Sequence, residues 1–260
     1  MLTGRIEQYS LPAGVSNWQS IQTLALSNNK FSGSISGTFQ ASSMPNLTSL
    51  DISINRFTGA LSDDYFSGMQ LTFLAMSVNA FGGSFPSSIG NMTNLTSLLM
   101  NGCGFTGALP ASFGNLVALT SVDLGINALT GSIPSSICAF SKLQSLVLSN
   151  NGFTGTLPSC FANLTALSNL NVQNNQLSGP LPACISSITS LQYLVLGTGN
   201  TFSGALSANY FSNLTSLVSL DLSYLSNLTS LQLNQLPALS QWCVFSYLNC
   251  HMSFFTSDAQ

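Results

Sequence analysis

Five aspartates and the single histidine are the candidates for acid–base chemistry that we consider in this sequence. They are Asp51, Asp123, Asp221, the adjacent pair Asp63 and Asp64, and His251. Two carboxylates about 5–10 Å apart would supply a general acid and a general base. A serine, a histidine and an aspartate in contact would instead activate a nucleophile. Either arrangement depends on the elements that carry these residues.

Those elements come from a repeat of 24 to 26 residues, which opens on the pattern L-x-x-L-x-L. Taking the first letter of that pattern as position 1, the units begin at Ile21, Leu47, Leu71, Leu95, Leu119, Leu143, Leu167, Leu191 and Leu217. A fixed period of this length predicts a solenoid, in which each unit buries its apolar face against the next.

Each part of the unit predicts a local structure. Leucines that alternate with polar residues predict one short strand per unit, stacked in parallel on its neighbours. An asparagine at position 9 can form hydrogen bonds with loop backbone groups that are not paired in a strand. In one unit Cys103 takes this position, and in another a one-residue insertion precedes the asparagine, Asn200. A Phe or Leu at position 11 predicts an inward spine, followed by a glycine turn. Leu-Pro or Ile-Pro then opens a brief convex segment.

The predicted fold class is therefore an α/β solenoid with a curved parallel β-sheet on the concave face and short 3₁₀ or irregular segments on the convex face. Residues 1–20 are interpreted as a partial N-terminal repeat, residues 21–222 as a solenoid of about nine units, and residues 223–260 as a C-terminal cap and tail.

This register keeps the carboxylates apart. Asp51, Asp123 and Asp221 all stand at position 5, three and four units apart. At ~4.8 Å per stacked strand, they would be separated by about 14 and 19 Å. Asp63 and Asp64 fall in a convex loop, where a solvated turn is expected, and the histidine lies in the tail. We predict no catalytic residues, no cofactor and, with one histidine and no close cysteine pair, no metal site.

The composition excludes further classes of protein. Charged residues make up 4% of the chain and the net charge is −3, so the basic stripe that nucleic-acid binding needs is missing. No apolar run approaches the ~18 residues of a membrane-spanning helix. The regular apolar spacing also argues against disorder.

The consensus L-x-x-L-x-L-x-x-N-x-F-x-G-x-L/I-P resembles that of plant-type extracellular leucine-rich repeat proteins, over about residues 21–222. Receptor-like ectodomains and polygalacturonase-inhibitor-like proteins belong to that class. The resemblance implies a secreted or cell-surface location and a disulfide between Cys138 and Cys160. The paired-cysteine N-terminal cap of the class is missing, and no signal peptide is visible.

The remaining cysteines leave alternatives. Cys184 lies one unit beyond Cys160 in the same register, so a Cys160–Cys184 bond is a rival pairing. Cys243 and Cys250 are predicted to pair within the cap. Cys103 is predicted to be buried and reduced.

Six N-x-T sequons predict N-linked glycosylation, at Asn46, Asn91, Asn94, Asn163, Asn213 and Asn227. Most precede a repeat start, where a glycan would be exposed to solvent. The alternative is that "NLT" recurs only because it belongs to the repeat.

The outward positions of the concave face are small and neutral. The candidate binding residues are Asp51, Phe73, Asp123, Tyr193, Asp221 and Tyr224. Binding hot spots favour Trp, Tyr and Arg, and this face offers few of them. At any single position, the simpler interpretation is that a serine solvates the strand.

Three functions follow from these features. The first is a non-enzymatic secreted glycoprotein with a structural, self-assembling role in a fibril, sheath or matrix, because so little charge opposes association. Its partners would be other copies or other extracellular proteins. The second is a ligand- or enzyme-recognition ectodomain. The third is an ice-binding protein, although the outward concave positions mix Ser with Asp, Phe and Asn instead of forming one rank of Thr.

Overall fold

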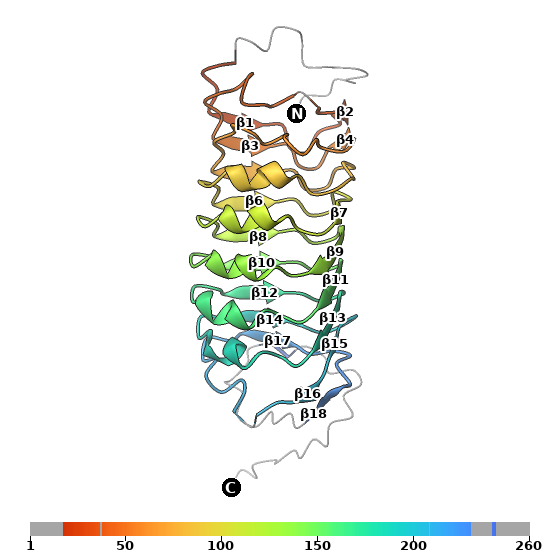
Figure 1. The fold of residues 1–260 in the computed structure, drawn as a ribbon, viewed down its shortest axis with the longest axis vertical. Coiled ribbons are helices and arrows are strands. Elements are labelled where there is room, and N and C mark those ends of the chain that lie inside the picture. Colours follow the sequence, from red (N-terminus) through yellow and green to blue (C-terminus); the bar gives the residue numbers. More distant parts are fainter. Residues whose placement is uncertain (1–17, 37, 208, 230–240, 243–260) are drawn as a thin grey trace.

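The computed structural model describes residues 18–36, 38–207, 209–229 and 241–242. In this part, the repeat units stack into one elongated solenoid (Figure 1). The predicted solenoid architecture is confirmed. The predicted pairing of Cys243 with Cys250, His251, most of the partial N-terminal repeat and most of the cap lie outside the described residues. The division into these three parts stays a prediction.

The concave face is a ten-stranded parallel sheet, with one three-residue strand from most units. In spatial order the strands are β1 (Thr23–Ala25), β3 (Ser49–Asp51), β5 (Phe73–Ala75), β6 (Ser97–Leu99), β8 (Ser121–Asp123), β10 (Ser145–Val147), β12 (Asn169–Asn171), β14 (Tyr193–Val195), β17 (Ser219–Asp221) and β19 (Gln241–Trp242). Equal repeat positions pair: Leu50 lies opposite Leu74, and Asp51 opposite Ala75. Equal positions therefore form rows across the sheet.

A second series of parallel strands, which the sequence analysis did not predict, runs along the side of the solenoid. Its five-stranded part consists of β7 (Thr106–Gly107), β9 (Ala128–Ser132), β11 (Gly152–Gly155), β13 (Gln176–Gly179) and β15 (Thr201–Phe202). Two further pairs are β2 (Ser32–Ser34) with β4 (Arg56–Thr58), and β16 (Gly204–Ala205) with β18 (Leu228–Thr229). The segment around F-x-G is extended in most units and pairs with that of the next unit, whereas the unit of Phe81 contributes only isolated bridges at Ala80 and Ser84.

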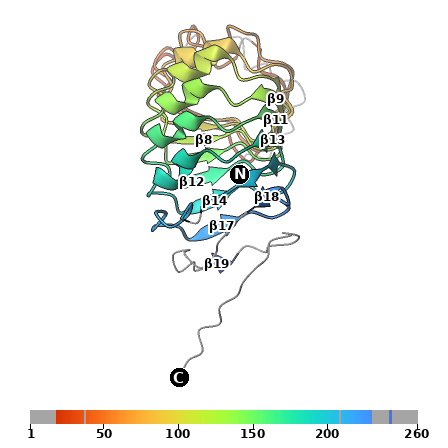
Figure 2. The same ribbon diagram turned by 60° about the horizontal axis from the view of Figure 1, so that its bottom comes forward.

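The convex segments after each proline are 3₁₀ helices, as their brevity predicted. They are η2 (Ser87–Asn91), η3 (Ala111–Asn115), η4 (Ser135–Ala139), η5 (Ser159–Asn163) and η6 (Ala183–Ser187). Each follows a proline with extended backbone, such as Pro86 before η2. In both ribbon views, these helices and the strands of the second sheet lie on opposite sides of the stack (Figures 1 and 2).

Between the two sides lies a continuous apolar core. From β3 onward, the apolar residues at positions 4 and 6 are buried, and the inward spine at position 11 is confirmed. Phe57 stacks on Phe31 and Phe81 with ring centroids 6.2 and 6.4 Å apart. Rings at this spacing add to the free energy gained by burying apolar area.

The asparagines at position 9 form the predicted ladder. The Asn79 amide donates to the carbonyls of Ile52 and Met76 and accepts from the Phe57 N–H at 3.0 Å. From Asn55 onward, each such asparagine thus bonds its own unit to the preceding one. Buried polar groups stay paired in this way, which lets loops without a regular ladder pack against the core.

Candidate functional site

The concave sheet carries the predicted binding residues in the rows that the sequence register predicts. Asp51, Asp123 and Asp221 lie in one row, at the last residue of β3, β8 and β17. Three and four strand steps separate them, or about 14 and 19 Å at ~4.8 Å per step. The structure therefore does not bring these carboxylates together.

Each of these aspartates is instead engaged with its own backbone. Oδ1 of Asp51 accepts from the N–H of Ser53 at 3.0 Å, and Oδ1 of Asp221 accepts from the N–H of Ser223 at 2.8 Å. Oδ1 of Asp123 accepts in the same way from Gly125 at 3.0 Å. This side-chain turn closes the strand, which is a common role for Asp and Asn. Sequence reasoning missed it, although the shared Ser-x-Asp-x context was visible.

Asp123 makes one further contact. Its second carboxylate oxygen accepts from the Asn101 amide of the preceding unit at 2.8 Å. With both oxygens bonded, this carboxylate serves as a link between two units.

The aromatic candidates lie at two separate places. Phe73 on β5 is half-buried, whereas Tyr193 on β14 and Tyr224 after β17 are exposed. Five strand steps lie between Phe73 and Tyr193, which corresponds to about 24 Å at ~4.8 Å per step. β14 and β17 are neighbours, so the two tyrosines lie in adjacent units. These two exposed tyrosines are the aromatic candidates toward the C-terminal end.

Beside the sheet runs a feature that the sequence analysis missed, which we name the apolar rim. It consists of Ile54, Val78 and Ile126, which stand at position 8, three residues beyond the ends of their strands. Their side chains are 50%, 51% and 62% exposed. The signal was visible, because Ile or Val replaces a polar residue immediately before the ladder asparagine.

The backbone of the rim is strained. Ile54, Val78 and Ile126 have φ values of 52°, 57° and 54°. This left-handed region suits Gly and Asn and disfavours β-branched residues, by about 1–2 kcal/mol each. At the same position other units carry Asn28, Gly102, Asn150, Asn174, Thr198 and Tyr224. The solenoid thus tolerates the unstrained choice, and the rim residues depart from it.

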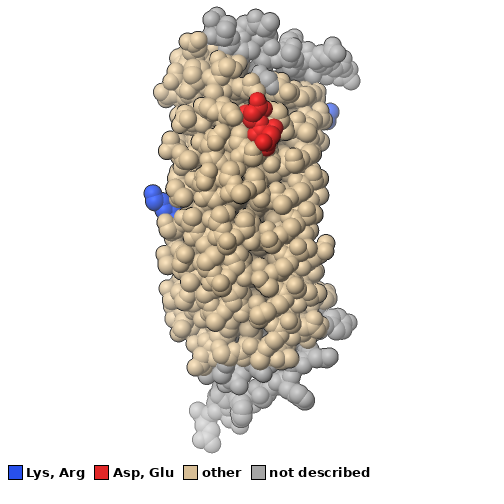
Figure 3. Space-filling model, viewed as in Figure 1, with Lys and Arg blue, Asp and Glu red and all other residues tan. Residues whose placement is uncertain are grey.

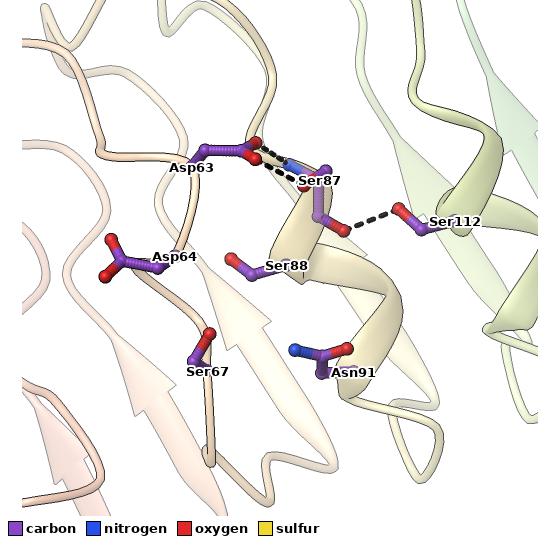
Figure 4. A pocket seen from close by; sticks show the side chains of 7 residues that line it. All are labelled: Asp63, Asp64, Ser67, Ser87, Ser88, Asn91 and Ser112. Atoms are coloured by element: carbon purple, nitrogen blue, oxygen red, sulfur yellow. Dashed lines mark hydrogen bonds between the residues drawn. The ribbon is translucent and has the colours of Figure 1, made fainter.

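Asp63 and Asp64 lie on the convex side, in a shallow hollow of about 490 Å³ (Figure 4). The Asp63 carboxylate accepts from the backbone N–H and the hydroxyl of Ser87, the latter at 2.6 Å. These bonds lower the pKa of Asp63. Ser87 begins η2 of the next unit, so Asp63 also joins two units. Around it, the face in Figure 3 carries one acidic patch and is otherwise almost uncharged in its described part.

The second sheet presents a row of hydroxyls. Position 12, directly after the spine residue, holds Thr58, Thr106, Thr130 and Thr154, all exposed. Ser32 and Ser178 hold the same position in β2 and β13 and complete this hydroxyl row. The row runs diagonally, because Thr154 lies opposite Ser132 and Thr130 opposite Gly152. The sequence pattern predicts a glycine turn here, so a threonine rank is expected only on the concave face.

The cysteines have distinct surroundings. Cys138 and Cys160 form a disulfide, with Cα atoms 5.8 Å apart, between η4 and η5. Cys184, the rival partner of Cys160, is a half-buried free thiol. Cys103 is a buried free thiol, and burial raises its pKa to about 12.

All six sequon asparagines, Asn46, Asn91, Asn94, Asn163, Asn213 and Asn227, are exposed. Among the described residues, no group of three or more His, Cys, Asp or Glu side chains could hold a metal ion. In the same residues, no helix is long and apolar enough to cross a membrane.

Known proteins share these repeats. A leucine rich repeat family profile matches residues 141–202, and a second profile of that description matches residues 20–42 and 94–116. The crystal structure of a TDR receptor is 31% identical over 89% of this chain, with a TM-score of 0.73. The chain is a leucine-rich repeat protein. Its repeats are of the plant extracellular type.

Two further structures resemble this leucine-rich repeat protein. The ectodomain of the Arabidopsis receptor kinase HAESA, solved with an IDA peptide hormone ligand, is 32% identical over 82% of the chain, with a TM-score of 0.72. A plant ice-binding protein is 22% identical over 74% of the chain and 68% of its own, with a TM-score of 0.54, and shares the fold. The chain spans 40% of the TDR receptor and 38% of the HAESA chain. The comparison with curated sequences found no match.

Proposed function

We propose that this leucine-rich repeat protein is a non-enzymatic extracellular scaffold that binds other polypeptides along the apolar rim and the adjoining concave sheet. The rim carries the proposal. Three exposed β-branched residues stay in a left-handed conformation that asparagine or glycine would adopt with less strain. Strain held at exposed side chains points to selection for contact, because these residues contribute nothing to the core.

The receptor ectodomains support a polypeptide as the partner. The HAESA ectodomain was solved in complex with a peptide hormone ligand, and it is 32% identical to this chain. In this form of the proposal, the protein recognises a peptide or an enzyme, as a receptor-like or inhibitor protein would. The six exposed sequon asparagines support an extracellular location.

The low charge supports a second form, in which the partner is another copy in a fibril, sheath or matrix. Charged residues make up 4% of the chain, so little repulsion keeps copies apart. An apolar rim on a neutral surface would add attraction between them. Both forms use the same surface and differ in the identity of the partner.

Cross-linking mass spectrometry of the protein from its own source tests the proposal. Links from the rim to a different polypeptide support recognition, and links from rim to rim between copies support assembly. The triple variant Ile54→Asn, Val78→Asn, Ile126→Asn should lose either set of links. Val117→Asn, which replaces a valine that is 50% exposed outside the rim, should keep them. Unchanged links in the triple variant would overturn the proposal.

The hydroxyl row of the second sheet favours one other function, ice binding. The register pairs Thr130 with Gly152 and Thr154 with Ser132, so each threonine is displaced by two residues from the next and lies about 8 Å from it, in strands without charged side chains. The variant Thr130→Tyr, Thr154→Tyr should then abolish inhibition of ice recrystallisation, whereas Ser145→Tyr on the concave sheet should preserve it. Wild-type protein that leaves recrystallisation unaffected removes this candidate.

A further inference from the structure

We infer that N-linked glycans coat one side of the solenoid, at the starts of the concave strands, and leave the apolar rim bare. The inference rests on the proposed extracellular function, and it adds an orientation to it. It is based on the sequon asparagines, most of which the fold places on the same side of the solenoid.

Five of the six sequon asparagines occupy the same part of the repeat unit. Asn91 and Asn163 are the last residues of η2 and η5. Asn46 and Asn94 each stand three residues before a concave strand, β3 and β6. Asn213 lies in the corresponding turn before β17. All five therefore lie where the convex segment returns to the concave sheet, and we name this set the glycan side.

The rim lies at the other end of the same strands. Asn46 is three residues before β3, and Ile54 is three residues after it. Because the strands of the concave sheet are parallel, all their starts share one side of the solenoid and all their ends share the other. Glycans on the glycan side would project away from the rim and from the second sheet.

The side chains on the glycan side have room for a sugar. All five are exposed, in contrast to ladder asparagines such as Asn79 and Asn175, which are buried and bonded on both sides. Asn46 donates from Nδ2 to the Gln19 carbonyl, and a glycan leaves one N–H there to keep that bond. Asn227, the sixth, lies next to β18 on the side of the second sheet.

A bulky polar coat on this side would also prevent the association that the low charge of the protein favours. The face with the 3₁₀ helices offers little charge to repel other molecules (Figure 3). Glycans there would keep that face in solvent and restrict contact to the rim, the concave sheet and the second sheet. This arrangement is one way in which a nearly neutral protein stays soluble and still binds at a chosen surface.

Site occupancy in the protein isolated from its source tests the inference. Digestion with elastase suits a chain that has only four Lys and Arg residues. Release of N-glycans in ¹⁸O-water then marks each occupied asparagine as labelled aspartate. We expect label at Asn163, Asn213 and at least one of Asn91 and Asn94. Absence of label from all five positions of the glycan side would overturn the inference, whatever the rim binds.

Two engineered sequons test the asymmetry. Val117→Thr creates a sequon at Asn115, the last residue of η3, which matches Asn91 and Asn163 in register. The pair Val78→Asn, Ala80→Thr creates one on the rim. Secreted protein with the first sequon should keep the wild-type cross-links, and protein with the second should lose them. Loss of the links with a glycan at Asn115 would show that the glycan side is itself a contact surface and would overturn the inference.

Discussion

Cys103 lies where the ladder would place an asparagine to accept from the backbone N–H of Phe81. In the preceding unit, the N–H of Phe57 donates to Oδ1 of Asn79, and in the following unit that of Phe105 donates to Asn127. The Cys103 thiol instead donates to the Met76 carbonyl at 3.3 Å. Phe81 is thus a spine residue whose N–H lacks an amide acceptor among the described residues, as is Phe202, for which Leu225 stands at the ladder position. A buried N–H without an acceptor costs about 1–3 kcal/mol.

Cys103→Asn should therefore repair the ladder. We expect the free energy of unfolding to rise by about 1 kcal/mol, because one buried N–H gains an acceptor. Urea denaturation followed by circular dichroism measures the change. A lower stability than that of the wild type would mean that the packing around the sulfur has closed too tightly to admit the amide.

Asn79→Ala should have the opposite effect. It removes bonds to Ile52, Met76 and Phe57 and leaves the buried Phe57 N–H without its acceptor, at a cost of about 3 kcal/mol. Asn29→Ala is the control, since within residues 18–36 and 38–207 the Asn29 side chain bonds only its own unit, to Leu26 and Ser27. Equal losses in the two variants would contradict the idea that the ladder acts between units.

Ile126→Asn should stabilise the fold while weakening binding. The left-handed backbone at φ 54° disfavours a β-branched side chain, so relief of strain should add about 1 kcal/mol. Thermal unfolding measures this, with Val117→Asn as the matched control. If stability does not rise, the rim is not strained, and the argument from strain to contact fails.

Cys103 should resist alkylation in the native protein. Burial raises the pKa of its thiol to about 12, so almost no thiolate exists at neutral pH. Peptide mapping after iodoacetamide treatment at pH 8 should find the half-buried Cys184 modified first. In urea, Cys103 should react as well. Rapid native modification of Cys103 would contradict its burial.

Asp63 should make stability depend on acid pH. Its bonds to Ser87 lower its pKa below the ordinary 3.8, so the folded state favours the charged form. That contribution is complete above the unfolded pKa, and it is lost as the pH falls from about 3.8 through the folded pKa. Asp63→Asn should therefore show a smaller drop in urea midpoint between pH 6 and pH 3 than the wild type.

Asp64→Asn is the matched control for that measurement. The adjacent Asp64 carboxylate has no hydrogen bond among the described residues, so the variant should keep the wild-type pH dependence. If Asp63→Asn and Asp64→Asn behave alike, the link to Ser87 does not contribute.

The sequence by itself determined the solenoid, the strand register, the inward spine and the asparagine ladder. These features follow from the repeat itself. Residues at the same repeat position, such as the ladder asparagines or the phenylalanines of the spine, have equivalent neighbours in most units. It also determined that Asp51 and Asp123 are too far apart for joint acid–base chemistry, because register fixes their separation.

Only the tertiary structure decided how the individual surfaces are used. Backbone groups take part in the turn that Asp51 closes, in the link from Asp63 to Ser87 and in the second sheet. Because these groups are the same in almost every residue type, the sequence does not reveal which of them will pair. The strain at Ile126 depends on a φ angle that only the assembled loop imposes. A repeat thus specifies which residues stack, whereas the path of the chain between them decides which side chains are strained, bonded or left exposed.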